Sequence, residues 1–474
     1  MIDVVVALVV ILGGTAAAVI HAFRYTPSER PYLIVSFVAH IASAFGQIAL
    51  VKVYYADGGD MINYMSDGTA IARLLELNFK EWFPYWVDLL LGREEAVGVL
   101  PILGAGSSTG STNALTAALA LLLFHSIYGI TLFIACCAYF GKTWLYDVLR
   151  ESLPEQMRRR LLVAALLVPS LVFWSCGILK ESFAIIGVGA FCLGLHRFLR
   201  GARLRGVIYM VTGAALVALV KPYILFALVL AGSTWIYAES LHAAQGRQGI
   251  IKVRPLYFVM SALIGFGALA ALMRAFPQFS LDNLGDGFAR YQGIGASEHR
   301  GAAFSLGDAE TRSLTGQLLF TPVALATSLF RPFFFEVRNA IAVGAAIETA
   351  IISVVFLNLV FRKRGKLRLI MSRPILPAAV VFTMIFGTAV GLATSNFGTL
   401  SRYRMPLMPF YALVLLVLTA PDAERLLLGT ATPERSNPAG RSRSLIGRGR
   451  GVVRTRRRPT PETSFATRNA RPPR

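Results

Sequence analysis

The residue types best suited to proton transfer are concentrated between positions 54 and 68, directly after a long apolar run. If this stretch is helical, Asp60, Tyr64 and Asp67 stand at positions i, i+4 and i+7 and share one face. That face has no basic partner. Two nearby carboxylates raise the pKa of one of them, which suits a proton acceptor near neutral pH. The alternative interpretation is an ordinary loop outside the membrane, capped by Asp57.

The chain that must position these residues is too apolar for a soluble protein. Hydrophobic residues make up 55% of its 474 residues and charged residues 15%, and the mean hydropathy is +0.59. Repeated apolar runs of about 20 residues predict an all-α, polytopic bundle of transmembrane helices. The four cysteines all fall in apolar runs and form no CxxC pair, so we interpret them as small buried hydrophobic residues.

The positions of the basic loops predict the topology of the bundle. With eleven spans, every basic cluster between spans falls on one side, which the positive-inside rule makes cytoplasmic. The expected protein is a multi-pass protein of the bacterial inner membrane, with its N-terminus outside and its C-terminus in the cytoplasm. The predicted spans are residues 4–23, 32–54, 129–149, 161–179, 182–198, 206–220, 223–239, 255–274, 338–361, 375–394 and 405–420.

Two long outward segments interrupt the predicted transmembrane domain 1–420, at about 55–112 and 276–337. The first contains aromatic and charged residues from Leu75 to Asp88, a pattern typical of an amphipathic helix that lies in the membrane interface. Its end, residues 104–112, is rich in Gly, Ser and Thr and predicts a flexible loop.

The charge is concentrated on the predicted cytoplasmic side. The net charge is +21, and residues 421–474 alone contain 13 Arg and four acidic residues. This composition predicts a disordered basic tail. Because anionic membrane lipids account for such a distribution, membrane lipids rather than nucleic acid are the expected partners.

Charged residues beside apolar runs on the outward side form a short list. Several cations close to carboxylates suit an anionic lipid phosphate next to a catalytic base, because a charge near the bilayer is costly unless it is paired or functional. The alternative for any one of them is a side chain that extends from a helix end to the interface. The candidates are Lys180, Glu181, Lys221, Arg331, Glu336, Arg402 and Arg404, together with Arg338.

Four stretches resemble motifs of the GT-C glycosyltransferases, the class that includes the protein mannosyltransferases and the lipid A aminoarabinose transferases. Residues 59–68 resemble the first-loop pattern GDxxxYxxxG, and residues 169–181 resemble the PS…FWSSG…KE signature of uncharacterised bacterial members. Residues 329–336 and 401–409 resemble later motifs of the same proteins. The resemblance covers about residues 1–420.

The resemblance implies transfer of a sugar from a polyprenyl-phosphate donor to a glycan, lipid or protein acceptor on the outer side, with inversion. Asp60 matches the position of the base, and Asp57 is the alternative, because the adjacent acidic pair of many class members is spread out here. Arg402, Arg404 and Arg331 would neutralise the leaving phosphate.

The expected binding set also contains Tyr64, Lys180, Glu181, Lys221 and Glu336. Whether the protein uses a metal ion stays open, because the class contains both metal-dependent and metal-independent members. Asp57 and Asp60 with Glu181 or Glu336 could hold one divalent ion through oxygen ligands.

Two other function classes compete with this hypothesis. A polysaccharide polymerase or ligase would also use outward arginines and polyprenyl-linked sugars but would not need the early acidic loop. A transporter or flippase predicts internal repeats and broken helices with charges at mid-membrane, and the sequence has no visible repeat. The sugar, the acceptor, the linkage and the oligomeric state do not follow from the sequence.

Overall fold

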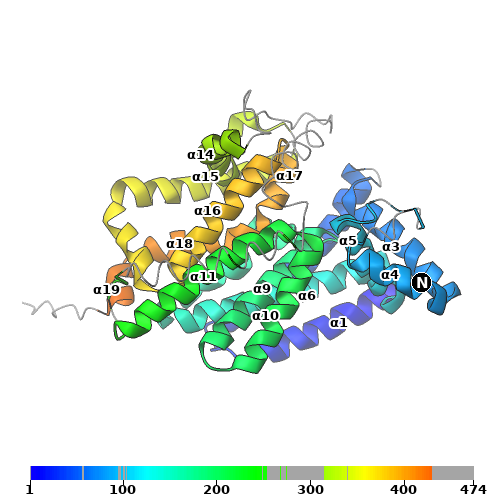
Figure 1. Ribbon diagram of the computed structural model, residues 1–474, viewed down its shortest axis with the longest axis horizontal. Helices are drawn as coiled ribbons and strands as arrows, with labels where there is room; N and C mark the ends of the chain where they lie inside the picture. The colour runs from blue at the N-terminus through cyan, green and yellow to red at the C-terminus, as the bar shows by residue number, and fades with distance from the viewer. Residues whose placement is uncertain are drawn as a thin grey trace, which may run out of the picture. The chain divides into compact units, whose positions relative to one another are not determined.

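In the computed structural model, every element described is a helix, as the apolar runs predict. The structure describes residues 2–55, 58–93, 98–99, 102, 104–247, 249–252, 267, 274, 314–338 and 340–429. Within these residues, eight helices are long and apolar enough to cross a membrane. They are α1 (Ile2–Ala22), α2 (Arg30–Ala49, continuing to Tyr54), α6 (Ile127–Ser152), α9 (Lys180–Leu199), α10 (Arg203–Val220), α11 (Pro222–Ala244), α15 (Ala340–Leu357, continuing to Arg362) and α16 (Ile375–Ala393) (Figure 1).

Of the other three predicted spans, two do not form continuous long helices, and the third is almost entirely outside the described residues. Residues 161–179 are divided into α7 (Arg158–Leu162), a π-helical turn (Val163–Leu167) and α8 (Pro169–Phe173). Residues 405–420 form α18 (Met408–Leu418), which at 11 residues is about 16 Å long. The predicted span 255–274 lies outside the described residues except for two positions. The structure therefore supports a multi-pass bundle with eight candidate spans.

Helix α9 lies between α6 and α10 and packs against both at glycines (Figure 1). A Cβ atom added at Gly189 would lie 1.9 Å from the backbone oxygen of Gly141 in α6. One added at Gly213 in α10 would lie 2.5 Å from the backbone oxygen of Gly187. Small residues at such crossings let membrane helices approach closely without a hydrophobic driving force. These contacts fix α9, whose first two residues are Lys180 and Glu181.

The break before α9 has a local cause. Val168 precedes a proline, which disfavours the helical conformation, and its ψ of 123° places it in the extended region. Buried carbonyl groups freed by such a break need new donors. The hydroxyl of Ser36 in α2 donates to the carbonyl of Leu166, just before the break. At the end of the short helix α8, Lys142 of α6 donates to the carbonyl of Leu171, and Gln47 of α2 donates to the carbonyl of Phe173.

The first predicted outward segment contains three helices: α3 (Asp60–Leu77), α4 (Phe79–Leu90) and α5 (Ser108–Leu122). The residues after Gly59 are helical, as assumed. The single amphipathic helix predicted near residues 75–88 is instead divided at Asn78, which ends α3 and caps α4. The prediction of a flexible loop at 104–112 is wrong for the second half of this stretch. Ser107 caps α5 by accepting a hydrogen bond from the amide of Thr109, so the helix starts at Ser108.

The C-terminal half of the described chain adds α14 (Leu314–Phe330), α17 (Phe397–Tyr403) and α19 (Ala423–Leu428). Helices α14 and α11 both pack against α16. Helix α19 lies in the stretch predicted to be a disordered tail, yet Ala423 and Leu427 are buried. The packed domain therefore extends beyond residue 420, and the rest of the predicted tail, from 430, lies outside the described residues.

Candidate functional site

The first acidic residue of the candidate site stands at the beginning of α3. Gly59, just before it, has a φ of +93°, a conformation that side-chain-bearing residues rarely adopt. This turn makes Asp60 the first residue of the helix, where the helix dipole favours a carboxylate. Asp67, two turns further on, instead accepts a hydrogen bond from Asn113 of α5 at 3.0 Å.

Four charged residues predicted from the sequence form one connected group, which we call the charged cluster: Asp60, Glu181, Lys221 and Arg402. The guanidinium of Arg402 lies 2.6 Å from the carboxylate of Asp60, and its Nε lies 3.4 Å from the carboxylate of Glu181. The other contact of Glu181 is with the Lys221 ammonium, at 2.5 Å. Two acids and two cations therefore alternate in a continuous chain of ion pairs.

Each member of the charged cluster is placed by a helix terminus. Glu181 is in the first turn of α9, and Arg402 is in the last turn of α17, where a cation is favoured by the dipole. Lys221 lies between α10 and α11, before Pro222, and its extended φ of −150° is typical of a residue that precedes proline. The bundle thus brings four separate helix ends together.

Exposure differs sharply along the charged cluster. The side chain of Asp60 is 43% exposed and that of Arg402 18%, whereas those of Glu181 and Lys221 are 2% and 4% exposed. Burying an ion pair costs desolvation free energy, which only good geometry and further partners offset. Asp60 is therefore the carboxylate that a ligand can reach, while Glu181 holds the two cations in place from inside.

Aromatic residues and a second lysine surround the cluster. The Lys221 ammonium lies 3.7 Å from the ring centroid of Tyr403, close enough for a cation–π interaction. Lys180 donates to the hydroxyls of Ser108 and Thr109 at the start of α5, and its ammonium lies 6.0 Å from the ring of Tyr64. Lys180 therefore connects the start of α9 to the start of α5 through hydrogen bonds.

The titration of the surrounding groups follows from burial and neighbouring charge. Burial, and then the Asp60 carboxylate, hold the pKa of the Tyr64 phenol well above its usual value. Burial also raises the pKa of Tyr403, against the opposing effect of Lys221. Although burial opposes it, the carboxylates of Glu181 and Asp60 hold the pKa of Arg402 well above its usual value. Both phenols therefore stay neutral hydrogen-bond donors, and the arginine stays charged.

The remaining predicted residues are in different contacts. Arg331 donates to the Glu336 carboxylate from Nε at 2.8 Å, so these two pair with each other. Arg404 is 2% exposed and donates to the backbone oxygen of Arg331 and to the hydroxyl of Thr349, each at 2.8 Å. The structure does not bring Arg404 into the charged cluster, although it is only two residues from Arg402.

The candidate metal ligands are only partly described. Asp57 lies outside the described residues, so the choice between Asp57 and Asp60 stays a prediction. Glu336 is engaged by Arg331 and does not join Asp60. In the described part of the chain, no group of three or more His, Cys, Asp or Glu side chains is arranged to hold a metal ion.

Several residues of the site were not predicted from the sequence. Tyr403 stands between the two predicted arginines, and its aromatic type beside two cations was an available signal. Ser108 and Thr109 were assigned to a flexible loop, and no sequence pattern connects them to Lys180.

Comparisons of the chain with protein-family models, with curated proteins and with solved structures find no match.

Proposed function

We propose that this protein is a membrane glycosyltransferase that moves a sugar from a polyprenyl-phosphate donor to an acceptor hydroxyl, with inversion at the anomeric carbon. The observation that carries the proposal is the charged cluster, in which a half-exposed carboxylate contacts a cation held from behind by a buried carboxylate. A reactive acid beside a fixed cation is the pairing that deprotonation of an acceptor and departure of a phosphate require.

The roles divide by exposure and charge. Asp60 takes the proton of the acceptor hydroxyl as the oxygen attacks the anomeric carbon. The bond between that carbon and the phosphate oxygen breaks, and the polyprenyl phosphate leaves with the electron pair. Arg402 neutralises the charge that develops on it, and its planar guanidinium can donate to two phosphate oxygens. Lys180 and Lys221 add positive charge nearby.

The contact between Asp60 and Arg402 gives the reaction an order. In the structure, Asp60 is engaged by the same guanidinium that would hold the donor phosphate. A bound phosphate competes for Arg402 and releases Asp60, which then becomes free to accept a proton. Donor binding therefore precedes activation of the acceptor, and Asp60 opposes donor binding until it is displaced.

The experiment is mass spectrometry of lipids that co-purify with the full-length protein. We expect a polyprenyl-phosphate sugar on the wild type and at least about tenfold less on Arg402→Ala, because a charge-assisted contact is lost. Arg73→Ala is the matched control, since Arg73 is an exposed arginine of α3 in the first predicted outward segment and is not among the candidate residues. Equal amounts of donor lipid on all three proteins, or none on the wild type, would count against the proposal.

A polysaccharide polymerase or ligase of the cell envelope stays the second candidate. It shares the need for Lys180, Lys221 and Arg402 but does not require a carboxylate in the first loop. Full turnover by Asp60→Asn and Asp57→Asn, with loss of turnover in Arg402→Ala, would favour that function.

A further inference from the structure

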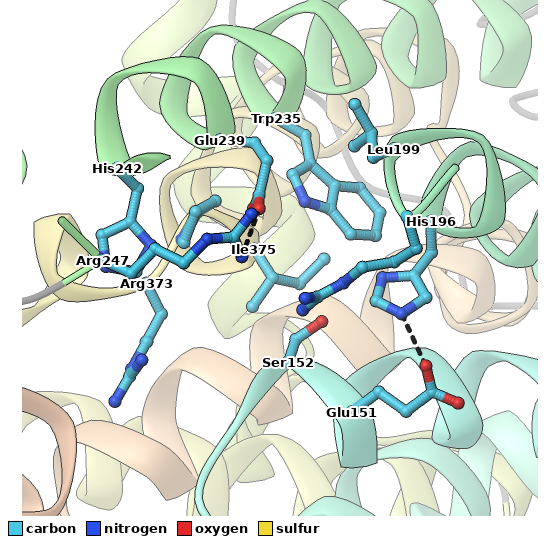
Figure 2. A pocket seen from close by; sticks show the side chains of 12 residues that line it. Glu151, Ser152, His196, Leu199, Trp235, Glu239, His242, Arg247, Arg373 and Ile375 are labelled. Atoms are coloured by element: carbon cyan, nitrogen blue, oxygen red, sulfur yellow. Dashed lines mark hydrogen bonds and ion pairs between the residues drawn. The ribbon is translucent and has the colours of Figure 1, made fainter. Parts of the chain in front are cut away.

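A second polar pocket lies at the opposite ends of the helices that carry the charged cluster. It has a volume of about 110 Å³ and lies between the ends of α6, α9 and α11 and the start of α16 (Figure 2). Glu181 in the first turn of α9 and His196 in its last turn are 15 residues apart, about 22 Å along the helix axis, which is most of the roughly 30 Å hydrocarbon thickness of a bilayer. The pocket therefore opens at the other membrane face and is distinct from the charged cluster.

The two carboxylates that line this pocket are already paired. Glu151 contacts Nε2 of His196 at 2.9 Å, and Glu239 contacts Arg247 at 3.2 Å, as the dashed lines in Figure 2 show. Two further arginines, Arg200 and Arg373, line the pocket, and no carboxylate of the described residues lies within ion-pair distance of either. The lining thus carries an excess of positive charge.

Two buried donor positions in the pocket lack partners. Nε of Arg373 and Nε2 of His242 are both inaccessible to solvent and make no hydrogen bond with any described residue. His242 as a whole is 5% exposed. Burial lowers the pKa of Arg373. A buried polar atom without a partner is costly and calls for a ligand that satisfies it.

The other wall of the pocket is apolar. Trp235, which is 4% exposed, faces the polar residues together with Leu199 and Ile375 (Figure 2). The pocket combines guanidinium donors on one side with apolar surface on the other.

We propose that this pocket binds a phosphate group, with Arg200, Arg373 and His242 as its contacts. Guanidinium groups bind phosphate in a planar, two-oxygen geometry, and a fully ionised phosphate offers acceptors for several donors at once. The phosphate could belong to an anionic phospholipid head group or be free in solution, and the experiment separates these sources. The inference does not depend on the sugar-transfer proposal, because no residue is shared.

The experiment uses the full-length protein in a neutral detergent and two probes. Native mass spectrometry with added phosphatidylglycerol, against phosphatidylcholine, measures lipid binding, and calorimetry with inorganic phosphate measures binding of the free ion. The variants are Arg200→Ala, which changes an exposed residue, and Arg373→Gln, which keeps amide donors on a half-buried side chain. Arg203→Ala is the control, because Arg203 is exposed, starts α10 and does not line the pocket.

We expect each pocket variant to weaken binding of at least one probe by about tenfold or more, while the control leaves it unchanged. Binding of phosphatidylglycerol alone identifies a lipid head group, and binding of inorganic phosphate identifies the free ion. Elution volume and thermal unfolding establish whether the variants are folded. If Arg373→Gln does not fold, Arg200→Ala alone tests the pocket. The proposal is overturned if neither probe binds the wild type, or if Arg203→Ala weakens binding as much as the pocket variants do.

Discussion

Replacement of Glu181 by glutamine tests whether this residue organises the charged cluster. Its carboxylate lies 2.5 Å from Lys221 and 3.4 Å from Arg402, and both Glu181 and Lys221 are almost fully buried. Removal of one member of a buried pair leaves the other charge without compensation, which typically costs about 3–5 kcal/mol. We therefore expect Glu181→Gln to lower the free energy of unfolding by about that amount.

The partner substitution should cost less. In Lys221→Met, Glu181 keeps its contact with Arg402, so one ion pair survives. The double variant Glu181→Gln with Lys221→Met removes both buried charges, and its stability should exceed that of Glu181→Gln alone, since apolar replacement of a whole buried pair is often close to neutral.

The assay is reversible unfolding of the detergent-solubilised protein, followed by circular dichroism. Glu76→Gln is the control, because Glu76 pairs with His125 while its side chain is 50% exposed, and such pairs contribute about 0–1 kcal/mol. If the double variant is as unstable as the sum of its two single variants, the ion pair does not organise the site and the argument is refuted.

Three further predictions concern the scaffold and the residues outside the cluster. Gly189→Ala should lower the free energy of unfolding by about 1–3 kcal/mol in the same assay, because the new Cβ atom meets the Gly141 carbonyl. In Gly344→Ala, the control, the new Cβ atom meets no atom within 4 Å, so stability should change little. Equal effects of the two substitutions would contradict the close helix packing. Arg404→Met should lower the free energy of unfolding, because it removes the donor to the Arg331 carbonyl. It should change donor-lipid affinity by no more than about twofold. A tenfold loss of affinity in a stable variant would show that Arg404 is part of the binding site. Truncation after Gly429 should retain turnover in membranes, because the removed residues have a disordered composition; a folded truncation without activity would show a direct role for the tail.

Apolar runs predicted most of the fold because membrane helices need about 20 apolar residues, a requirement that is visible in sequence. Eight predicted spans correspond to continuous helices. A continuous span at 161–179 is not confirmed, because the apolar run is long enough but Pro169 ends the helical conformation of Val168. Hydropathy cannot report such a break, since the carbonyl of Leu166 just before it is satisfied by Ser36 of α2, which is distant in sequence.

The site was predictable to the extent that charge near an apolar run is costly and therefore rare. That rule selected Lys180, Glu181, Lys221 and Arg402, which the structure brings together or beside one another. The rule could not separate Arg402 from Arg404. Arg402 lies in the last turn of α17 and contacts the charged cluster, whereas Arg404 donates to the buried hydroxyl of Thr349. Side-chain direction at a helix end depends on tertiary packing, which spacing along the chain does not encode.

The proposed roles of Asp60 as the base and of Arg402 as the contact of the donor phosphate are tested most directly by donor-lipid affinity and single-turnover rate, measured in the same variants. For Asp60→Asn we predict a rate lowered by about 10²–10⁴-fold with donor affinity unchanged or higher, because the carboxylate that competes for Arg402 is gone. For Arg402→Ala we predict donor affinity lowered by about 10–150-fold together with the rate. Asp67→Asn, which alters the residue held by Asn113, is the control and should turn over normally. Normal binding and turnover in both Asp60→Asn and Arg402→Ala would contradict the account.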